Sequence, residues 1–506
     1  MTRVAVIGAG VGGLSAAISL ASAGLRATVF ERAESVGGKV RVALVGDLPV
    51  DVGPTVLTMR WVFDELFARA GQSLEAHVRL EKLTTLARHA WSGGRRLDLF
   101  ADQDLSRRAI ADAFGDREAE GFERFCRDTA RMYATVEGPF LRAQRPTFGS
   151  LLKDAGSLGL GGLARIDAHR SMASALARYF RTPELRQLFG RYATYTGSSP
   201  FEAPATLNLI AHVEGQGVWR VAGGMAALAR ALEDVARGLG VEFVLGADIL
   251  SIDAPSGRVV GVVARDGARF PADIAIVNAD VSALSGMLGG SSKAPRATPP
   301  RQRSLSAVTW ASAGSVSGAP LAYHNVFFSD DDAAEFDALF TQRRVPDAPT
   351  VYVCAQDRDD GLDAGGVQRL FTIINAPATG DEPARWSATE LRRCEEATSR
   401  TLDRAGLSIR AQASHPTTPC DFEARFPKTG GALYGPAARG MLSSFSREGA
   451  RTKIGGLYLA GGSVHPGPGL PMVSLSGQLA ARAVKEDLAS IARSRTVAMS
   501  GSTSTG

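Results

Sequence analysis

A glycine-rich loop near the N-terminus is the feature that most constrains the fold. Residues 4–7, VAVI, form a short apolar run, and they are followed by GAGVGG, which fits G-x-G-x-x-G. Apolar residues then recur at helical spacing as far as Gly24, and residues 27–30 read as a second strand that ends at Glu31. A strand, loop, helix, strand and acidic residue in this order predict a Rossmann-like α/β unit that binds a nucleotide.

Each part of the loop has a physical role in holding a pyrophosphate. Gly8 permits the tight turn out of the strand, Gly10 lets the backbone approach the phosphates, and Gly13 lets the helix pack closely on the strand. Gly12 belongs to the helix N-terminus, which offers N–H groups and a partial positive charge. Glu31 is suited to accept hydrogen bonds from ribose hydroxyls.

Two further glycine-containing turns follow closely. Residues 35–39 read SVGGK, and residues 51–55 read DVGPT. Bare backbone from several loops therefore converges near one nucleotide. That arrangement suits a long cofactor with a ribityl chain and a ring beyond the pyrophosphate, although the spacing itself leaves both NAD and FAD open.

A second loop rich in glycine and proline lies near the C-terminus. Residues 461–471 read GGSVHPGPGLP, after an apolar run at 457–460 and before a helix-like stretch at 473–488. So many glycines and prolines exclude regular helix or strand. The stretch is either a rigid structural turn or a loop whose backbone lies against a ligand.

These motifs resemble a known family. GAGVGGL, ERAESVGGK and DVGPT resemble the N-terminal signature of FAD-dependent amine-oxidase-like flavoproteins. Within that group the chain is similar to the bacterial phytoene-desaturase type of carotenoid desaturases, through GVWRVAGGMAALARAL (217–232), FPADIAIVNAD (270–280) and GGLYLAGGSVHPGPGLP (455–471). The resemblance covers nearly the whole chain except its tail, and it implies that the cofactor is FAD.

The resemblance also implies which residues hold FAD. A strand at 457–460 would deliver the C-terminal loop to the flavin, and the helix after Pro471 would point its N-terminus at the ring. The backbone of Ile249 would lie near the adenine. The expected cofactor-binding residues are Gly8, Gly10, Gly12, Gly13, Glu31, Arg32, Gly38, Lys39, Gly53, Pro54, Thr55, Ile249, Gly462, Ser463, Pro471, Met472 and Val473.

The domain organisation follows from the same resemblance. We expect a Rossmann-like FAD-binding domain of the amine-oxidase and GDP-dissociation-inhibitor type, built from residues 1–75, 218–285 and 450–490. Residues 76–217 and 286–449 would form a discontinuous α+β domain that holds the substrate and faces the membrane. Residues 494–506 are mostly small and polar and are expected to be a disordered tail.

One segment of the second domain mixes aromatic residues with arginines. Residues 176–195 read LARYFRTPELRQLFGRYATY, with apolar residues at helical spacing. Its arginines and aromatic residues could meet lipid headgroups, or the segment could be an ordinary helix packed on the core with solvated arginines. The second interpretation is favoured.

The bulk composition excludes several classes of protein. The net charge of +5 is mild for 506 residues, and no basic helix or zinc finger indicates nucleic-acid binding. The four cysteines are widely spaced, without a C-x-x-C pair, so neither a metal site nor a disulfide framework is expected. The N-terminus lacks a secretory signal, which predicts a cytoplasmic protein. A carotenoid is insoluble in water, so we also expect peripheral contact with the cytoplasmic face of a membrane.

No catalytic set of side chains is visible, and the catalytic residues are left unassigned. His324 and His465 are interpreted as packing residues. A desaturase needs little acid–base help, because loss of a hydride beside a polyene leaves a delocalised cation whose neighbouring C–H is acidic. The protein would mainly orient the substrate in a dry channel.

Three stretches resemble the 1-hydroxycarotenoid 3,4-desaturase branch: FGRYATYTGSSPF (189–201), TLNLIAHVEGQGVWRV (206–221) and HNVFFSDD (324–331). The implied reaction is FAD-dependent desaturation of an acyclic 1-hydroxycarotenoid, such as 1-hydroxyneurosporene, at C3–C4, with quinone or oxygen as electron acceptor. Tyr192, Thr194, Tyr195 and Ser198 are candidates for recognising the tertiary hydroxyl. The alternatives are a phytoene desaturase, an amine or porphyrinogen oxidase, and a flavin-free lipid-binding relative of the GDP-dissociation inhibitors.

Overall fold

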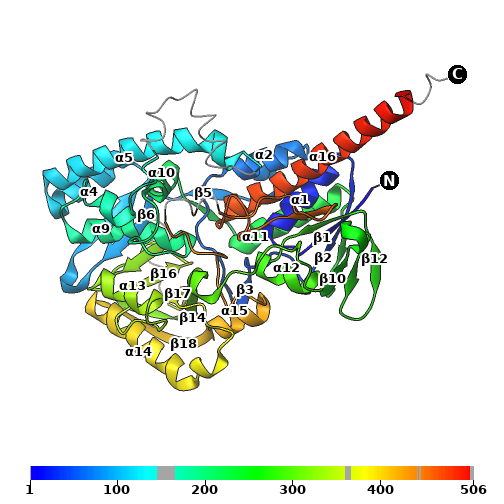
Figure 1. Ribbon diagram of the computed structural model, residues 1–506. Coiled ribbons are helices and arrows are strands. Elements are labelled where there is room, and N and C mark those ends of the chain that lie inside the picture. Colours follow the sequence, from blue (N-terminus) through cyan, green and yellow to red (C-terminus); the bar gives the residue numbers. More distant parts are fainter. Residues whose placement is uncertain (1, 145–165, 359–365, 441–442, 444–445, 502–506) are drawn as a thin grey trace.

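The computed structural model describes residues 2–144, 166–358, 366–440, 443 and 446–501, and Figure 1 shows two lobes side by side. The first lobe is built on a five-stranded sheet whose strands are all parallel. Three distant stretches of the chain supply these strands. In spatial order they are β19 (Leu457–Leu459), β13 (Ile274–Val277), β1 (Arg3–Ile7), β2 (Arg26–Phe30) and β9 (Glu242–Val244).

Apolar helices cover one face of this sheet, and a small antiparallel sheet covers the other. On the first face, α1 contacts both α11 and α16, and the three helices share a single core. On the second face lie β10, β11, β12 and α12. Their bounds are α1 (Val11–Ala21), α11 (Met225–Gly238), α16 (Leu470–Gly501), β10 (Ile249–Asp253), β11 (Gly261–Ala264), β12 (Arg269–Pro271) and α12 (Val281–Met287).

The second lobe is built on a seven-stranded sheet in which neighbouring strands are antiparallel, except for the parallel pair β15–β6. Two strands come from before α11 in the chain and five from after it. In spatial order the strands are β18 (Leu407–Thr417), β14 (Ser306–Gly318), β17 (Gln368–Ala376), β16 (Val351–Ala355), β15 (His324–Phe327), β6 (Thr85–Ala90) and β7 (Arg96–Phe100).

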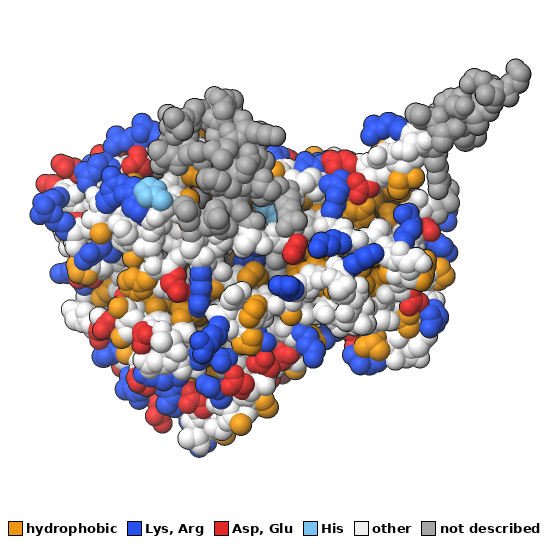
Figure 2. Space-filling model, viewed as in Figure 1, with side chains coloured by type: hydrophobic (Ala, Val, Ile, Leu, Met, Phe, Trp, Pro, Cys, Tyr) orange, Lys and Arg blue, Asp and Glu red, His pale blue; other side chains and the backbone are white. Residues whose placement is uncertain are grey.

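Helices surround this sheet and link it to the first lobe. They are α2 (Trp61–Arg69), α3 (Leu74–His77), α4 (Gln103–Phe114), α5 (Asp116–Val136), α8 (Met172–Leu176), α9 (Pro183–Gly190), α10 (Leu209–Gln216), α13 (Asp332–Phe340), α14 (Ala388–Arg404) and α15 (Pro419–Arg425). Shorter helical turns are η1 (Ser92–Gly94), η2 (Glu137–Leu141), η3 (Arg191–Thr196), η4 (Ala205–Asn208), η5 (Pro255–Gly257), η6 (Pro300–Gln302) and η7 (Pro383–Arg385). On the face in Figure 2, acidic and basic side chains are intermixed over this lobe.

A hairpin from the N-terminal segment crosses to the second lobe. Strands β3 (Val42–Val45) and β4 (Leu48–Asp51) pair with each other and pack on β14, β17 and β18 through a shared apolar core. A second small ladder joins β5 (Leu80–Lys82) to β8 (Trp219–Val221). Residues 42–51, which we expected in the FAD-binding domain, therefore contribute to the core of the other lobe. The predicted fold class, a Rossmann-like α/β domain with a discontinuous second domain, is confirmed.

The prediction about the C-terminal tail needs correction. Helix α16 continues as far as Gly501, so residues 494–501 are helical rather than a disordered tail, because neither proline nor glycine occurs between Gly477 and Gly501. Residues 502–506 lie outside the described part of the chain. In the described residues, no helix is long and apolar enough to span a bilayer.

The arginine-rich segment 176–195 packs on the core, as favoured. Its apolar face is buried, and Phe180 is only 1% exposed, so that ring is unavailable to a lipid interface. The prediction that the arginines of this segment are solvated is wrong for Arg191. Arg191 lies over the rings of Tyr192 and Tyr195, 5.4 and 5.2 Å from their centroids, and donates to the hydroxyl of Tyr195. A buried glutamate, described below, balances this charge.

Candidate cofactor and substrate site

The glycine loop after β1 closes around the side chain of Asn278, the residue that follows β13. A Cβ atom on Gly10 would lie 2.9 Å from Asn278 Nδ2, and one on Gly12 would lie 2.6 Å from Asn278 Oδ1. Asn278 Nδ2 also donates to the carbonyl oxygen of Gly8. The motif predicts that the absence of a side chain on Gly10 leaves space for a pyrophosphate. The side-chain amide of Asn278 also needs this space. Asn278 is a site residue that the motif does not reveal.

The remaining loop glycines allow close backbone packing. Gly8 has a φ of +99°, which is the left-handed region that favours glycine. A Cβ atom on Gly13 would lie 2.0 Å from the carbonyl oxygen of Gly8, as expected for a helix that packs tightly on its strand. Gly12 faces Val473 at the start of α16, so the first turns of α1 and α16 lie together.

Glu31 is held at the end of β2 by two backbone amides. Its Oε2 accepts from the N–H of Ala9 at 2.7 Å, and its Oε1 accepts from the N–H of Ala33 at 3.0 Å. A carboxylate oxygen has two lone pairs, so each oxygen keeps one for a ribose hydroxyl. Ile249 packs in the same apolar core as Phe30, which places it beside this end of the loop.

The second and third glycine turns lie against the first. The N–H of Gly37 donates to the carbonyl oxygen of Ala9 at 2.9 Å, and a Cβ atom on Gly38 would lie 3.1 Å from the Cα of Gly10. A Cβ atom on Gly53 would lie 2.1 Å from the carbonyl oxygen of Lys39. Pro54 and Thr55 follow Gly53 directly, so the three predicted turns form one continuous surface.

Lys39 provides a cation at this surface. Its Nζ donates to the carbonyl oxygen of Leu433 at 2.5 Å. Burial lowers the pKa of Lys39, while the charge of Asp280 acts in the opposite direction. The side chain nevertheless keeps accessible surface. An accessible ammonium group beside these glycine turns suits a phosphate.

Arg447 holds the C-terminal loop and was not predicted from the sequence. Its guanidinium donates to three carbonyl oxygens, those of Tyr434 at 3.1 Å, Pro436 at 3.0 Å and Gly462 at 2.9 Å. Burial lowers the pKa of Arg447 to about 10, and the charge of Asp280 opposes that shift. No motif surrounds Arg447, so only its position next to Gly462 reveals its role.

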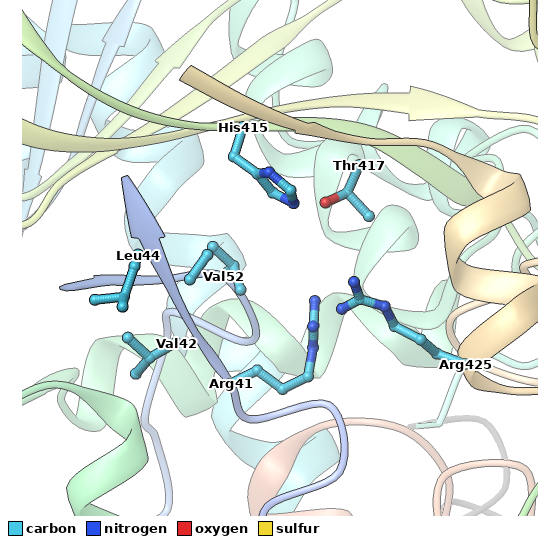
Figure 3. Close-up of a pocket in the computed structure, with 8 residues that line it drawn as sticks. Arg41, Val42, Leu44, Val52, His415, Thr417 and Arg425 are labelled. Carbon is cyan, nitrogen blue, oxygen red and sulfur yellow. The ribbon is translucent and has the colours of Figure 1, made fainter. Parts of the chain in front are cut away.

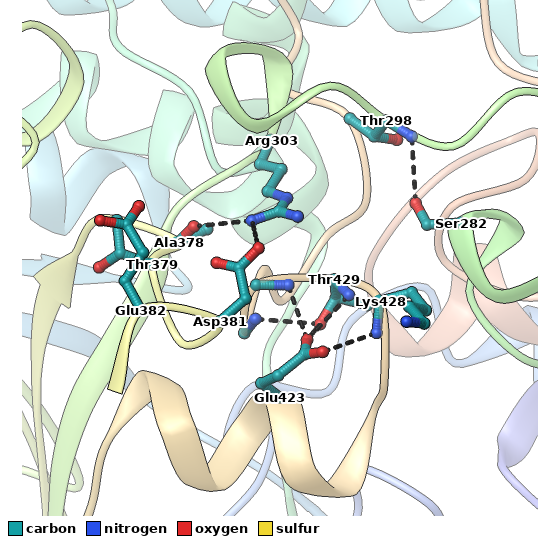
Figure 4. A network of polar contacts seen from close by, with 12 residues as sticks. Ser282, Thr298, Arg303, Ala378, Thr379, Asp381, Glu382, Glu423, Lys428 and Thr429 are labelled. Carbon is teal, nitrogen blue, oxygen red and sulfur yellow. Dashed lines mark hydrogen bonds and ion pairs between the residues drawn. The ribbon is translucent and has the colours of Figure 1, made fainter. Parts of the chain in front are cut away.

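The segment that Arg447 and Lys39 bind is itself fixed by a polar network (Figure 4). The Glu423 carboxylate accepts from the backbone N–H groups of Lys428, Thr429 and Gly430 at 2.7–2.9 Å. Arg303 donates to Asp381 at 2.8 Å. The network anchors the loop after α15, which leads to residues 433–436.

The C-terminal loop is bonded on several sides. Ser463 Oγ accepts from the N–H of Val281 at 3.0 Å, and the N–H of Gly461 donates to Ser476 Oγ at 3.1 Å. His465 Nε2 lies 2.9 Å from the carbonyl oxygen of Phe140, and the two rings meet edge to face. These contacts fit the interpretation of His465 as a packing residue. Pro471, Met472 and Val473 form the first turn of α16.

Arg32 points to a different neighbour than expected. Its guanidinium donates to the carbonyl oxygens of Ala424 and Arg425 at the end of α15. It therefore ties the first nucleotide segment to α15. Its contact with a cofactor stays a prediction.

The surface formed by these loops fits FAD. It gathers bare backbone from four segments at the carboxyl ends of β1, β13 and β19. Gly10 is the N-cap of α1 and no side chain caps that helix, so its first N–H groups are free for phosphate oxygens. Glu31 and Lys39 supply the ribose acceptor and the phosphate cation.

A chain of polar groups lies beside Thr55. The hydroxyls of Thr55 and Tyr352 are 2.7 Å apart, and the Tyr352 hydroxyl is 2.6 Å from Nδ1 of His324. Around it the sheet is apolar, with Ala311 and Phe371 in the same core as the β3–β4 hairpin. Burial and the charge of Arg191 lower the pKa of His324 to about 3, so its ring is neutral at pH 7.

The side chains that we expected to recognise a hydroxyl are engaged with other groups. Tyr192 and Tyr195 donate to the two carboxylate oxygens of Glu214, at 2.6 and 2.7 Å. Thr194 Oγ1 donates to the carbonyl oxygen of Arg191 at 2.8 Å, and Ser198 Oγ donates to that of Ala438 at 2.6 Å. The structure therefore uses these four hydroxyls to hold η3 and its surroundings.

A separate pocket of about 240 Å³ lies between β3, β18 and the end of α15 (Figure 3). Arg41 and Arg425 turn their guanidinium groups toward the same space, and His415 and Thr417 face it from β18. Among the residues that the structure describes, no carboxylate lines the pocket. Leu44 also lines it and is 74% exposed, which is unusual for a leucine.

Comparison with known proteins agrees with this geometry. Residues 11–485 match the family of flavin containing amine oxidoreductases. A hydroxyneurosporene desaturase of Rubrivivax gelatinosus is 48% identical, over 99% of this chain and 97% of its own. A 1-hydroxycarotenoid 3,4-desaturase of Flavobacterium sp. is 29% identical, over 95% and 98% of the two chains.

Among solved structures, putrescine oxidase superposes with a TM-score of 0.60 and 16% identity, over 96% of this chain and 99% of that one. This likeness concerns the fold alone. The chain therefore belongs to the flavin containing amine oxidoreductase family, where it groups with the carotenoid desaturases, and it is an FAD-dependent oxidoreductase.

Proposed function

We propose that the protein desaturates an acyclic 1-hydroxycarotenoid, such as 1-hydroxyneurosporene, at C3–C4. The observation that carries this proposal is the 48% identity to a hydroxyneurosporene desaturase along almost the entire length of both chains. The 29% identity to a 1-hydroxycarotenoid 3,4-desaturase supports it.

The reaction removes a hydride and a proton from neighbouring carbons. When bound, FAD supplies the two-electron acceptor for the hydride. The protein's own part is to hold the allylic carbon in place and to exclude water. No side chain is assigned as the base, because the proton lost beside the delocalised cation is strongly acidic.

The direct test uses purified protein loaded with FAD and supplied separately with 1-hydroxyneurosporene and phytoene, with a quinone or oxygen as electron acceptor. We expect 1-hydroxyneurosporene to lose two hydrogens and gain one double bond, read by chromatography and absorbance. Conversion of phytoene alone would replace this proposal by the phytoene desaturase alternative. Comparing rates with quinone under anaerobic conditions and with oxygen identifies the electron acceptor.

Peripheral contact with a membrane is part of the proposal, because the substrate dissolves in lipid. The exposed face of β3 suits this contact better than segment 176–195. Val42 and Leu44 are 43% and 74% exposed, and the cations Arg41 and Arg425 lie beside them. Exposed apolar side chains next to cations match the surface of an anionic bilayer.

Vesicle binding tests this surface. Wild-type protein should sediment with phosphatidylglycerol vesicles more than with phosphatidylcholine vesicles, and Leu44→Glu should reduce that binding severalfold. The matched control is Leu250→Glu on β10, which removes another exposed leucine, 49% accessible. Equal binding by both variants would remove the hairpin assignment.

A further inference from the structure

The proposed function raises the question of how the protein recognises the hydroxyl of its substrate. This inference rests on that function. A hydroxyl that leaves water for an apolar channel loses hydrogen bonds, and its binding is weakened unless the protein replaces them. A site that bonds a substrate hydroxyl discriminates strongly against the analogue without it.

Covalent geometry restricts where the protein group that binds the substrate hydroxyl can lie. The hydroxyl is on C1, two bonds from C3, so its oxygen lies within about 4 Å of a reacting carbon. That carbon must itself approach the flavin to within about 3–3.5 Å. The partner therefore belongs beside the loops that hold the flavin, and Thr55 ends one of these loops.

The hydrogen-bonded side chains of Thr55, Tyr352 and His324 lie where this group is needed, beside the third glycine turn. The hydroxyls of Thr55 and Tyr352, 2.7 Å apart, belong to side chains that keep accessible surface. Burial raises the pKa of Tyr352 well above its usual value, so its hydroxyl keeps its proton and can donate a hydrogen bond. His324, 2% exposed, sits behind Tyr352 with its Nδ1 2.6 Å from the hydroxyl.

These three side chains also have unused hydrogen-bonding capacity. A neutral histidine, a tyrosine and a threonine carry three polar hydrogens in total. The two hydrogen bonds among these side chains use two of the three hydrogens, and His324 Nε2 is buried without a partner. An alcohol both donates and accepts, so it can complete the chain at the Thr55–Tyr352 pair.

The four hydroxyl groups that the sequence suggested for this role already have hydrogen-bond acceptors. Tyr192 and Tyr195 donate to Glu214, and Thr194 and Ser198 donate to backbone carbonyls. We infer that the paired hydroxyls of Thr55 and Tyr352 bind the C1 hydroxyl of the substrate, and that His324 acts through Tyr352 as a positioning residue. The pair thereby selects hydroxylated carotenoids and sets which bond faces the flavin.

Tyr352→Phe tests the inference, because it removes one hydroxyl and keeps the ring. We measure kcat/KM for 1-hydroxyneurosporene and for neurosporene, which lacks the hydroxyl, at matched FAD content. The preference for the hydroxylated substrate should fall about 10- to 100-fold, since only the hydroxylated substrate loses a partner. A structural defect would lower both values together. Tyr323→Phe, directly before β15, is the matched control and should leave the preference unchanged.

His324 provides a second variant. In His324→Asn an amide can replace Nδ1 and should keep most of the preference, whereas His324→Phe should lose it. Direct binding of 1-hydroxyneurosporene, followed by its absorbance shift without turnover, should weaken in Tyr352→Phe. If the wild-type protein converts neither carotenoid, the proposed function fails. If it converts 1-hydroxyneurosporene and Tyr352→Phe keeps the full preference, this inference alone is overturned.

Discussion

Gly477 in the last helix faces the carbonyl oxygen of Gly12 in the first helix so closely that a Cβ atom on Gly477 would lie 2.0 Å from that oxygen. The hydroxyls of Ser15 and Ser474 meet 2.9 Å apart beside this contact. The two ends of the chain are therefore joined through bare backbone at the position where both cofactor loops begin. Gly477 lies outside every motif, yet the approach of α16 to α1 depends on it.

We expect Gly477→Ala to separate α1 from α16, because the obstructing atom belongs to backbone that cannot rotate away. The free energy of unfolding should fall by about 1–3 kcal/mol, and FAD should dissociate more readily. Thermal unfolding and the flavin absorbance per protein measure both effects. Gly286→Ala is the control, since a Cβ atom at that helical glycine meets nothing within 4 Å. Equal behaviour of the two variants would contradict the packing argument.

Gly10→Val should abolish FAD retention, because its side chain would enter the space shared by Asn278 and the pyrophosphate. The double variant Gly10→Ala/Asn278→Ala separates these two demands. Removing the amide, which lies 2.9 Å from the Cβ position, should restore much of the stability lost in Gly10→Ala. FAD content should stay low if the phosphates also need the space. Full FAD content in Gly10→Val would count against the loop assignment.

Arg447→Met should release the C-terminal loop. Three backbone carbonyls would lose their shared donor in a buried place, at a cost of about 3 kcal/mol or more in unfolding free energy. Arg447→Lys should not restore the loss, because an ammonium group does not reproduce the planar fork of a guanidinium. Bound FAD and the unfolding temperature are the measurements. The control is Arg269→Met, whose side chain is 73% exposed and whose ion pair with Asp253 should contribute little.

Asp332 should make stability depend on pH. Burial, and then the charge of Asp331, raise the pKa of Asp332 to about 7 from 3.8. Between these values the folded protein binds the proton more tightly than the unfolded chain, so stability decreases as the pH rises from 4 to 7. Asp332→Asn should therefore gain stability over the wild type, by about 1 kcal/mol at pH 8 and less at pH 5. The unfolding temperatures at both pH values test this sign, with exposed Asp403→Asn as the control. A gain that is larger at pH 5 would refute it.

The sequence by itself determined the first nucleotide-binding unit, from β1 to Glu31. Its strand, loop and helix depend on neighbours a few residues away, and the positive φ at Gly8 favours glycine there. The second glycine turn and the C-terminal loop could be recognised for the same reason. A resemblance carried by these motifs was sufficient to identify the fold and FAD.

Only the tertiary structure decided which side chains complete the site. Asn278, Arg447 and Tyr352 occur in ordinary strand or loop sequences, and each acquires its role from a partner far along the chain, Gly8, Gly462 and Thr55. Likewise, the hydroxyls near Tyr195 looked free for a substrate until Glu214 was placed beside them. Parallel strands order themselves by long crossovers rather than by sequence neighbours. The strand order therefore determines which residues meet where such strands end, and local sequence patterns cannot reveal these contacts.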